Sequence, residues 1–181
     1  MPSIDQFTKY LQDNPIQRTN RFQVSVQKPG EQMLTFFAES VTLPGRSLAT
    51  LERRTMGKVS QGDFPYEQLY SGDLDMNIVM TEAGGERSYF EDWMDLIING
   101  QGSVLTNRLD YIGDMKIGLL GTQSSGPNSE IVVREVFPKS IGSVTMSNAE
   151  ENSYGILPIG LSFRDYEWLG SDTPPTSNGL H

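Results

Sequence analysis

The sequence predicts a mainly β fold: an antiparallel barrel or sandwich with one flanking amphipathic α-helix. Apolar residues alternate with polar ones in at least seven short segments, as they do in strands with one buried face. Most of these segments are joined by turn-forming residues, which favours antiparallel pairing. Only residues 88–100 have the clear spacing of an amphipathic helix, and they interrupt the series of strands.

Length and composition exclude several functions. A chain of 181 residues suits one domain with a core of its own. It contains no cysteine, which excludes disulfides and thiolate metal sites and permits a reducing compartment. No apolar run approaches the roughly 20 residues that cross a bilayer, and the N-terminus lacks the pattern of a secretion signal. We therefore expect a soluble, unprocessed protein.

The net charge of −9 has the wrong sign for a protein that grips nucleic-acid phosphates. Two explanations of this acidity stay open at this point. It keeps a surface soluble, or it repels an anionic partner that must pass without binding.

The pattern divides the chain into three parts. Residues 1–19 form an N-terminal arm, in which apolar residues at helical spacing end at a turn containing Pro15. Residues 20–169 hold the alternating segments and form the barrel domain. Residues 170–181 are polar, have nothing to bury and are expected to be a flexible tail.

The first strand covers RFQVSVQ, where Phe22, Val24 and Val26 share one face, and KPGE turns the chain back. MLTFFAESV then runs antiparallel to it. After LPG, residues 47–70 alternate only weakly and predict an extended hairpin or loop. A compact domain rarely carries such an excursion without a use, so it is either a protruding contact element or an ordinary mobile loop. The candidate contact residues in it are Arg53, Arg54, Lys58, Phe64 and Tyr66.

DLDMNIVMTE resumes clean alternation and leads into the helix. Ser88 is the expected N-cap, with Glu91 completing a capping box, and NGQG ends the helix. The helix has two faces. Its apolar stripe, expected to close the barrel, comprises Tyr89, Phe90, Trp93, Met94 and Ile97. Its acidic face, which is either solvated or turned towards a partner, comprises Glu91, Asp92 and Asp95.

Four further strands are expected, in DMKIGLLG, EIVVREVF, SIGSVTMS and GILPIGLSFRDYEW. The region of Pro138 separates the second from the third. Pro158 lies within the last strand and lacks a ladder donor, so its amide position is expected at an edge or a bulge.

Nothing in the sequence predicts catalysis, a cofactor or a metal site. The single histidine, His181, lies in the polar tail, which excludes a histidine-based triad or a multi-histidine site. NGQGSV follows a helix and lacks both the third glycine of a dinucleotide fingerprint and the lysine of a phosphate loop. A pair of carboxylates brought together from distant strands is the one catalytic arrangement that spacing cannot test.

Read in order, the segments resemble the tail tube protein family of contractile-tailed bacteriophages. The resemblance rests on NRFQVSV, FFAESVTLPG, DLDMNIVMTE followed directly by RSYFEDWMDLI, VFPKSIGSVTMS and GILPIGLSFRDYEW, and spans residues 20–168. It implies a non-enzymatic subunit of the virion tail, assembled in the host cytoplasm. Six copies would close into a ring, and rings would stack into a tube inside a contractile sheath. The tape-measure protein and double-stranded DNA would pass through the lumen without specific binding, and sheath and baseplate proteins would be further partners.

The resemblance also implies kinship with the hexameric ring protein of type VI secretion. Within this class, a baseplate, tail-terminator or secretion-system ring protein shares the expected fold. A rival from another class is a small ligand-binding barrel of lipocalin type, which predicts a monomer with an apolar internal pocket.

Overall fold

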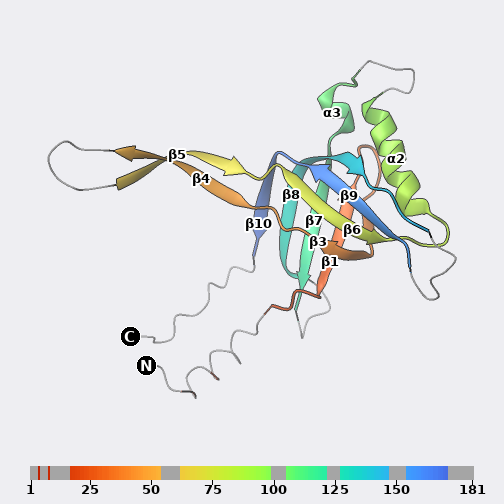
Figure 1. The fold of residues 1–181 in the computed structure, drawn as a ribbon, viewed down its shortest axis with the longest axis horizontal. Coiled ribbons are helices and arrows are strands. Elements are labelled where there is room, and N and C mark those ends of the chain that lie inside the picture. The colour runs from red at the N-terminus through yellow and green to blue at the C-terminus, as the bar shows by residue number, and fades with distance from the viewer. Residues whose placement is uncertain are drawn as a thin grey trace.

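The computed structural model describes Ile4, Thr8 and residues 17–53, 62–98, 105–121, 127–146 and 154–170. The predicted fold class is confirmed: the described chain is mainly antiparallel β structure, arranged as a sandwich with helix α2 beside it (Figure 1). The strands are β1 Phe22–Gln27, β2 Leu34–Phe36, β3 Ala38–Val41, β4 Arg46–Arg53, β5 Gly62–Tyr70, β6 Asp73–Val79, β7 Gly113–Leu120, β8 Pro127–Ile141, β9 Ile156–Ser162 and β10 Asp165–Leu169. The helices are α2 Gly85–Ile97 and the single turn α3 Arg108–Tyr111.

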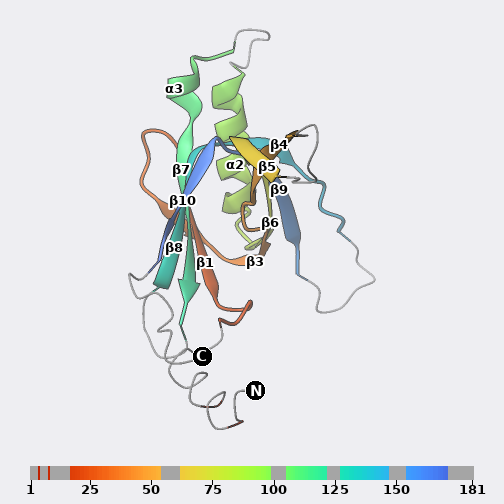
Figure 2. The same cartoon turned by 90° about the vertical axis from the view of Figure 1, so that its left-hand side faces the viewer.

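One sheet with the strand order β2-β1-β7-β8-β9-β6-β3 folds over to make both layers of the sandwich. Strand β8 belongs to both layers, because its first part pairs with β7 and β10 and its last part, from Phe137, pairs with β9. Figure 2 shows β1, β7, β8 and β10 on one side and β3, β6 and β9 on the other. The two end strands of the sheet, β2 and β3, pair with β1 and β6 and not with each other, so the barrel stays open.

The segment MLTFFAESV therefore corrects the expectation of one strand beside β1. Its first half forms β2 on β1, and its second half crosses to the other layer as β3 on β6. The crossing occurs at Phe37, whose side chain is 77% exposed. Phe36, one residue earlier, packs against the aromatic rings of Tyr89 and Phe90.

The C-terminal strands differ from the prediction in two ways. Strand β8 continues through Pro138, which is accommodated by a register shift before Ser140, and only the first two residues of SIGSVTMS belong to it. GILPIGLSFRDYEW breaks at Phe163 and Arg164 into β9 and β10.

Strand β9 lies between β8 and β6, but the position of the missing Pro158 amide faces a point beyond the end of β8. The Pro158 carbonyl accepts a hydrogen bond from the Gly142 amide, one residue beyond the end of β8. Because the N and O of a strand residue face the same neighbour, the absent N–H also points past that end, where no ladder donor is required.

The core lies between the two layers and beneath α2. Alternating residues of β1, β6 and β9 are buried as their pattern predicts, and β7 and β8 contribute further aliphatic side chains. The fully enclosed apolar residues of these strands are Val24, Val26, Leu74, Met76, Ile78, Met115, Ile117, Ile131, Val133, Val136, Leu157, Ile159 and Leu161.

Candidate assembly surfaces

Helix α2 begins earlier than the sequence predicts. Its N-cap is Gly84, in the left-handed region with φ of 63°, and Ser88 lies inside the helix, so the proposed capping box does not form. Glu86 turns back in its place: its Oε2 accepts hydrogen bonds from the Thr81 amide at 3.2 Å and the Thr81 hydroxyl at 3.1 Å. Glycine reaches the left-handed conformation without a Cβ penalty, so the GG pair allows a sharper entry than a serine cap.

Burial acts to raise the pKa of the Glu86 carboxyl, but hydrogen bonds from its own amide and from Thr81 outweigh it and lower that pKa. The ionised carboxylate at the first turn also suits the positive end of the helix.

The apolar stripe of α2 faces the sandwich, with Tyr89, Phe90 and Trp93 buried and Met94 and Ile97 half-buried. Two hydrogen bonds tie the helix to residues next to the sheet, one after β1 and one at the end of α3. The Lys28 amide donates to the Tyr89 hydroxyl at 2.8 Å, and the Trp93 Nε1 donates to the Tyr111 carbonyl at 2.7 Å. Burial raises the pKa of the Tyr89 phenol, so the hydroxyl stays protonated.

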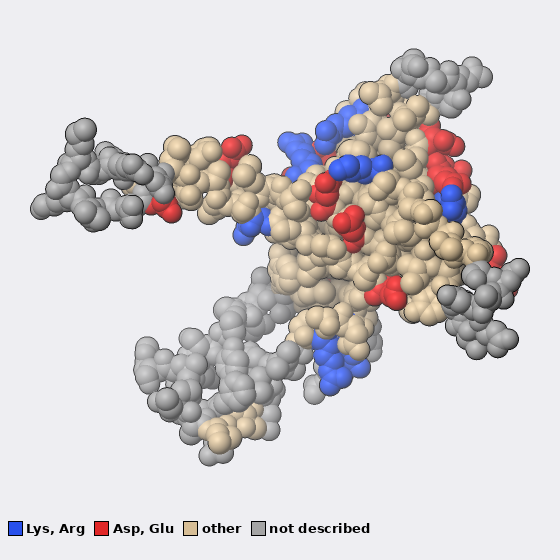
Figure 3. Space-filling model, viewed as in Figure 1, with Lys and Arg blue, Asp and Glu red and all other residues tan. Residues whose placement is uncertain are grey.

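The acidic face of α2 is exposed. Glu91, Asp92 and Asp95 all lie on the outside, and Glu91 accepts a hydrogen bond from Arg87 at 2.7 Å. Figure 3 shows the resulting group of acidic atoms along the helix. An exposed i,i+4 pair of this kind contributes only about 0.3–0.5 kcal/mol, so the face is free to take another partner.

Strands β4 and β5 form a hairpin of their own, paired only with each other and projecting from the body (Figure 1). Strands of this length span roughly 30 Å. Apolar side chains along it are exposed, among them Leu51 (61%), Phe64 (54%) and Tyr66 (61%). Leu51 and Phe64 are cross-strand partners. Isolated two-stranded hairpins are marginal in water, and exposed apolar side chains on one are a candidate contact surface.

Of the basic residues predicted for this contact, the described part of the chain includes only the backbone of Arg53. Arg53 ends β4, opposite Gly62. Arg54 and Lys58, like the side chain of Arg53, lie outside the described residues.

Three strands of the folded sheet are edges within the described chain: β2, β3 and β10. Strand β10 continues the line of β9 along β8, but only β9 is covered on its other side, by β6. Trp168 and Leu169 on β10 are about half exposed. A free edge bearing apolar side chains is a surface on which another chain can pair.

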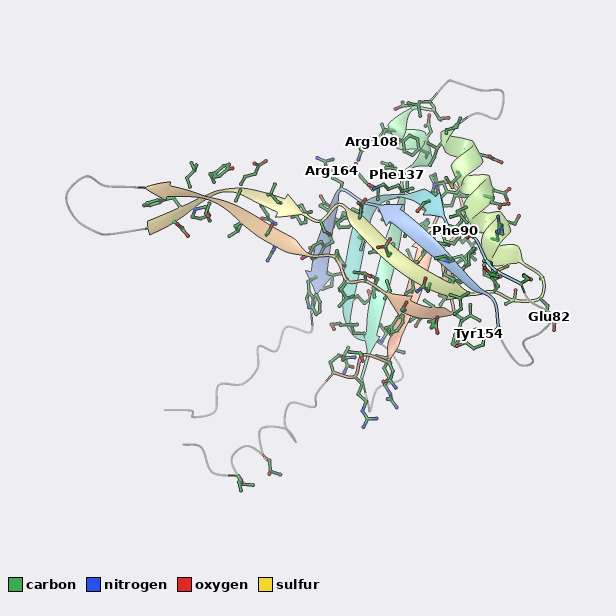
Figure 4. The ribbon with its side chains drawn as sticks, viewed as in Figure 1. Glu82, Phe90, Arg108, Phe137, Tyr154 and Arg164 are labelled. Atoms are coloured by element: carbon green, nitrogen blue, oxygen red, sulfur yellow. The ribbon has the colours of Figure 1, made fainter. Side chains whose placement is uncertain are left out.

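An arginine pair around Glu135 was not foreseen from the sequence. Glu135 has a left-handed φ of 52° where β8 passes between layers. Its carboxylate accepts hydrogen bonds from Arg164 at 2.6 Å and from Arg108 at 2.9 Å. Figure 4 labels both arginines. Hydrogen bonding from Arg164, then from Arg108, lowers the pKa of Glu135 despite desolvation. The three residues come from α3, β8 and the β9–β10 corner, so no local spacing signals the cluster.

The described residues contain no group of three or more histidine, cysteine or acidic residues placed to hold a metal ion. Beside Glu135 lies an open depression of about 440 Å³, lined largely by charged side chains including Arg134 and Asp165. No helix in the described part is long and apolar enough to cross a membrane.

The model of the family described as "Phage tail tube protein" matches residues 6–169. The chain belongs to the phage tail tube protein family. Its members are structural proteins, which confirms the expectation of a non-enzymatic subunit. No curated protein matches the chain.

Solved structures share the fold of this tail tube protein at low sequence identity. A chain of the anti-feeding prophage baseplate, symmetrised six-fold, is 15% identical with a TM-score of 0.68, covering 88% of this chain and 99% of its own. A chain of the sheath–tube complex of the extracellular contractile injection system PVC is 19% identical, with a TM-score of 0.65 and coverage of 94% and 100%. A chain of the PVC sheath/tube terminator is 21% identical, with a TM-score of 0.64 and coverage of 86% and 97%.

Proposed function

We propose that the protein is the repeating subunit of a phage tail tube, in which six copies close into a ring and rings stack into a conduit for double-stranded DNA. The observation that carries the proposal is the projecting β4–β5 hairpin with exposed apolar side chains, on a chain of the tail tube family. The tube functions in the virion tail after assembly in the host cytoplasm, within a sheath and on a baseplate.

The open sheet edges suit a closed ring. Strands β2 and β10 are the two outer strands of one layer, whose order is β2-β1-β7-β8-β10. A head-to-tail contact between different edges of successive copies is heterologous, and closes into a ring when the rotation per copy allows it. Ring closure then removes the edges that would otherwise favour aggregation.

The acidity of the chain has a use in a conduit. Six subunits of charge −9 that turn part of this charge inward make a negative lumen, which repels DNA phosphates from every wall. Cargo then passes without being held. The acidic face of α2 and the hairpin remain for contacts outside the lumen, the first towards a neighbour or the sheath, the second towards the next ring.

Electron microscopy of the purified protein, with sizing of the same sample at low and high concentration, tests the proposal. Hollow six-fold rings or tubes are expected. A monomer at every concentration, including after addition of preformed tube ends, contradicts it and favours the ligand-binding barrel.

A second candidate is a ring protein of the baseplate or tube end. The likeness to chains in baseplate and terminator structures favours it. Stack length separates the two functions, because a tube subunit extends indefinitely whereas an end protein stops at one or a few rings.

A further inference from the structure

The β4–β5 hairpin joins the body through short links at Gly45 and Gly72. At the root, the Ser71 amide donates to the Gly45 carbonyl at 3.1 Å, which ties the two strands of the hairpin to each other. Gly72 has a left-handed φ of 72°, and its carbonyl accepts a hydrogen bond from the Phe163 amide at 3.0 Å. A few residues at the end of an element can absorb a change in backbone angle. The links therefore fix where the hairpin starts and leave its direction to side-chain contacts.

One side chain of the hairpin makes such a contact. Of the apolar residues described on β4 and β5, Tyr70 is the one that packs against the core. Its ring meets the ring of Tyr166 on β10 edge-on, with centroids 5.5 Å apart. The Gln68 side chain donates to the Tyr70 hydroxyl at 2.8 Å and holds the ring in place on β5. Edge-to-face pairs have a preferred mutual orientation, so this pair favours one direction of the hairpin.

Tyr166 is itself placed by strand β10, at the edge of the body from which the hairpin leaves (Figure 1). Its ring meets the buried ring of Phe163 with centroids 6.4 Å apart. The next residue of β10, Glu167, forms an ion pair with Arg134 on β8. Within the described chain, β10 pairs with β8 alone, and its other side is a free edge. One strand thus carries both the support of the hairpin and an edge that another chain can pair with.

We infer that Tyr166 on β10 positions the hairpin: through Tyr70, it sets the direction in which β4 and β5 leave the body. A strand with few contacts is held less firmly than one paired on both sides. A second chain that pairs with the free edge of β10 therefore also steadies Tyr166 and, with it, the hairpin. The consequence for assembly rests on the proposed function. Neighbours that join at β10 within a ring fix the hairpins before the next ring is added.

Distances between two spin labels test the positioning role in the isolated subunit. The natural chain has no cysteine, so two engineered cysteines take up two labels and no more. The test pair replaces the exposed residues Asp63 on the hairpin and Lys116 on β7. The control pair replaces Lys116 and the exposed Asp92 on α2, both in the body. Pulsed electron paramagnetic resonance then measures the distribution of distances for each pair.

Tyr166→Ala should broaden the distribution between labels at 63 and 116 and extend it to distances that the parent chain lacks. The distribution between labels at 92 and 116 should stay as it is, which separates movement of the hairpin from damage to the body. Tyr166→Phe keeps the ring and should restore the narrow distribution. Trp168→Ala changes another aromatic residue of β10, one that is 53% exposed, and should leave both distributions unchanged.

Tyr70→Ala removes the same contact from the side of the hairpin, so the inference stays testable if Tyr166→Ala does not fold. The double variant should broaden the distribution no further than either single variant, because both substitutions remove one shared contact. A hairpin that keeps its narrow distribution in Tyr70→Ala, or whose broadening adds up in the double variant, overturns the positioning role.

Assembly separates this inference from the proposed function. If copies stack into a tube, Tyr166→Ala should raise the protein concentration needed for stacking about two- to ten-fold, the range expected for loss of one aromatic pair, and Tyr166→Phe should restore it. Stacking of Tyr166→Ala at the wild-type concentration overturns the link to assembly. A wild-type chain that never stacks overturns the proposed function, while the label distances in the single subunit still decide the positioning role.

Discussion

Replacing Trp93 with alanine tests whether α2 closes the sandwich. Trp93 has no exposed surface, stacks on Phe90 with ring centroids 6.3 Å apart and meets Tyr89 edge-on at 6.2 Å. It also supplies the 2.7 Å hydrogen bond to the Tyr111 carbonyl. Alanine therefore leaves a large cavity and an unpaired carbonyl beside it.

The expected cost follows from these contacts. Truncating a buried large aromatic residue costs about 3–5 kcal/mol, and a half-buried carbonyl left without its donor adds about 1 kcal/mol. A domain of this size is stable by about 5–15 kcal/mol in total, so the variant should fold but only narrowly. With a urea m-value of about 2 kcal/mol/M, the unfolding midpoint should fall by roughly 2–3 M.

Equilibrium urea unfolding, followed by circular dichroism, measures this midpoint. The chain offers a matched control in its other tryptophan, Trp168, which is 53% exposed on edge strand β10. Trp168→Ala should change the free energy of unfolding by no more than about 0.5 kcal/mol. Equal midpoints for the wild type and Trp93→Ala would refute the closing role of the helix.

Two further predictions come from the structure and one from the sequence. Gly113→Ala should destabilise the fold, because its Cβ would overlap the Gln27 carbonyl oxygen and lie 2.9 Å from Cζ2 of Trp93; Gly45→Ala, where nothing lies within 4 Å, is the control in the same urea titration. Glu135→Gln should lose stability relative to the wild type near pH 6. The difference should shrink as the pH falls through the lowered folded pKa of Glu135, since a depressed carboxyl pKa stabilises only above it; a constant gap from pH 6 to 3 would contradict the arginine pairing. Reversing charge at Arg53 and Arg54 should leave the melting temperature unchanged and weaken ring stacking in electron micrographs, and unaltered stacks would remove those residues from the inter-ring contact.

The burial of strand residues could be predicted from the sequence because a period of two reports directly on one buried face. Leu74, Met76 and Ile78 are enclosed, as their alternation indicates. Which strands pair, and in which layer, could not be predicted in the same way. Within MLTFFAESV the chain changes layers at Phe37, a choice made by distant partners on β1 and β6.

Local rules failed where two of them competed. Ser88 and Glu91 satisfy the spacing of a capping box, but the preceding glycines let the helix start at Gly85, with Thr81 and Glu86 completing the entry. Pro138 suggested a strand boundary, whereas β8 absorbs it at a register shift. The Glu135 cluster joins residues far apart in the chain, so periodicity carries no information about it.

In the proposed tube, helix α2 lets one chain be a stable subunit and still leave its sheet edges to other copies. The sandwich is an unclosed sheet, and a subunit that closed it by pairing β2 with β3 would have no edge at either strand. The helix instead contacts both the turn after β1, through Tyr89 and the Lys28 amide, and the entry to β7, through Trp93 and the Tyr111 carbonyl. Folding and assembly thus rest on different residues. Changes in the aromatic stripe should act on the isolated subunit, while changes to exposed side chains on the hairpin or β10 should leave the subunit folded and act only when copies meet.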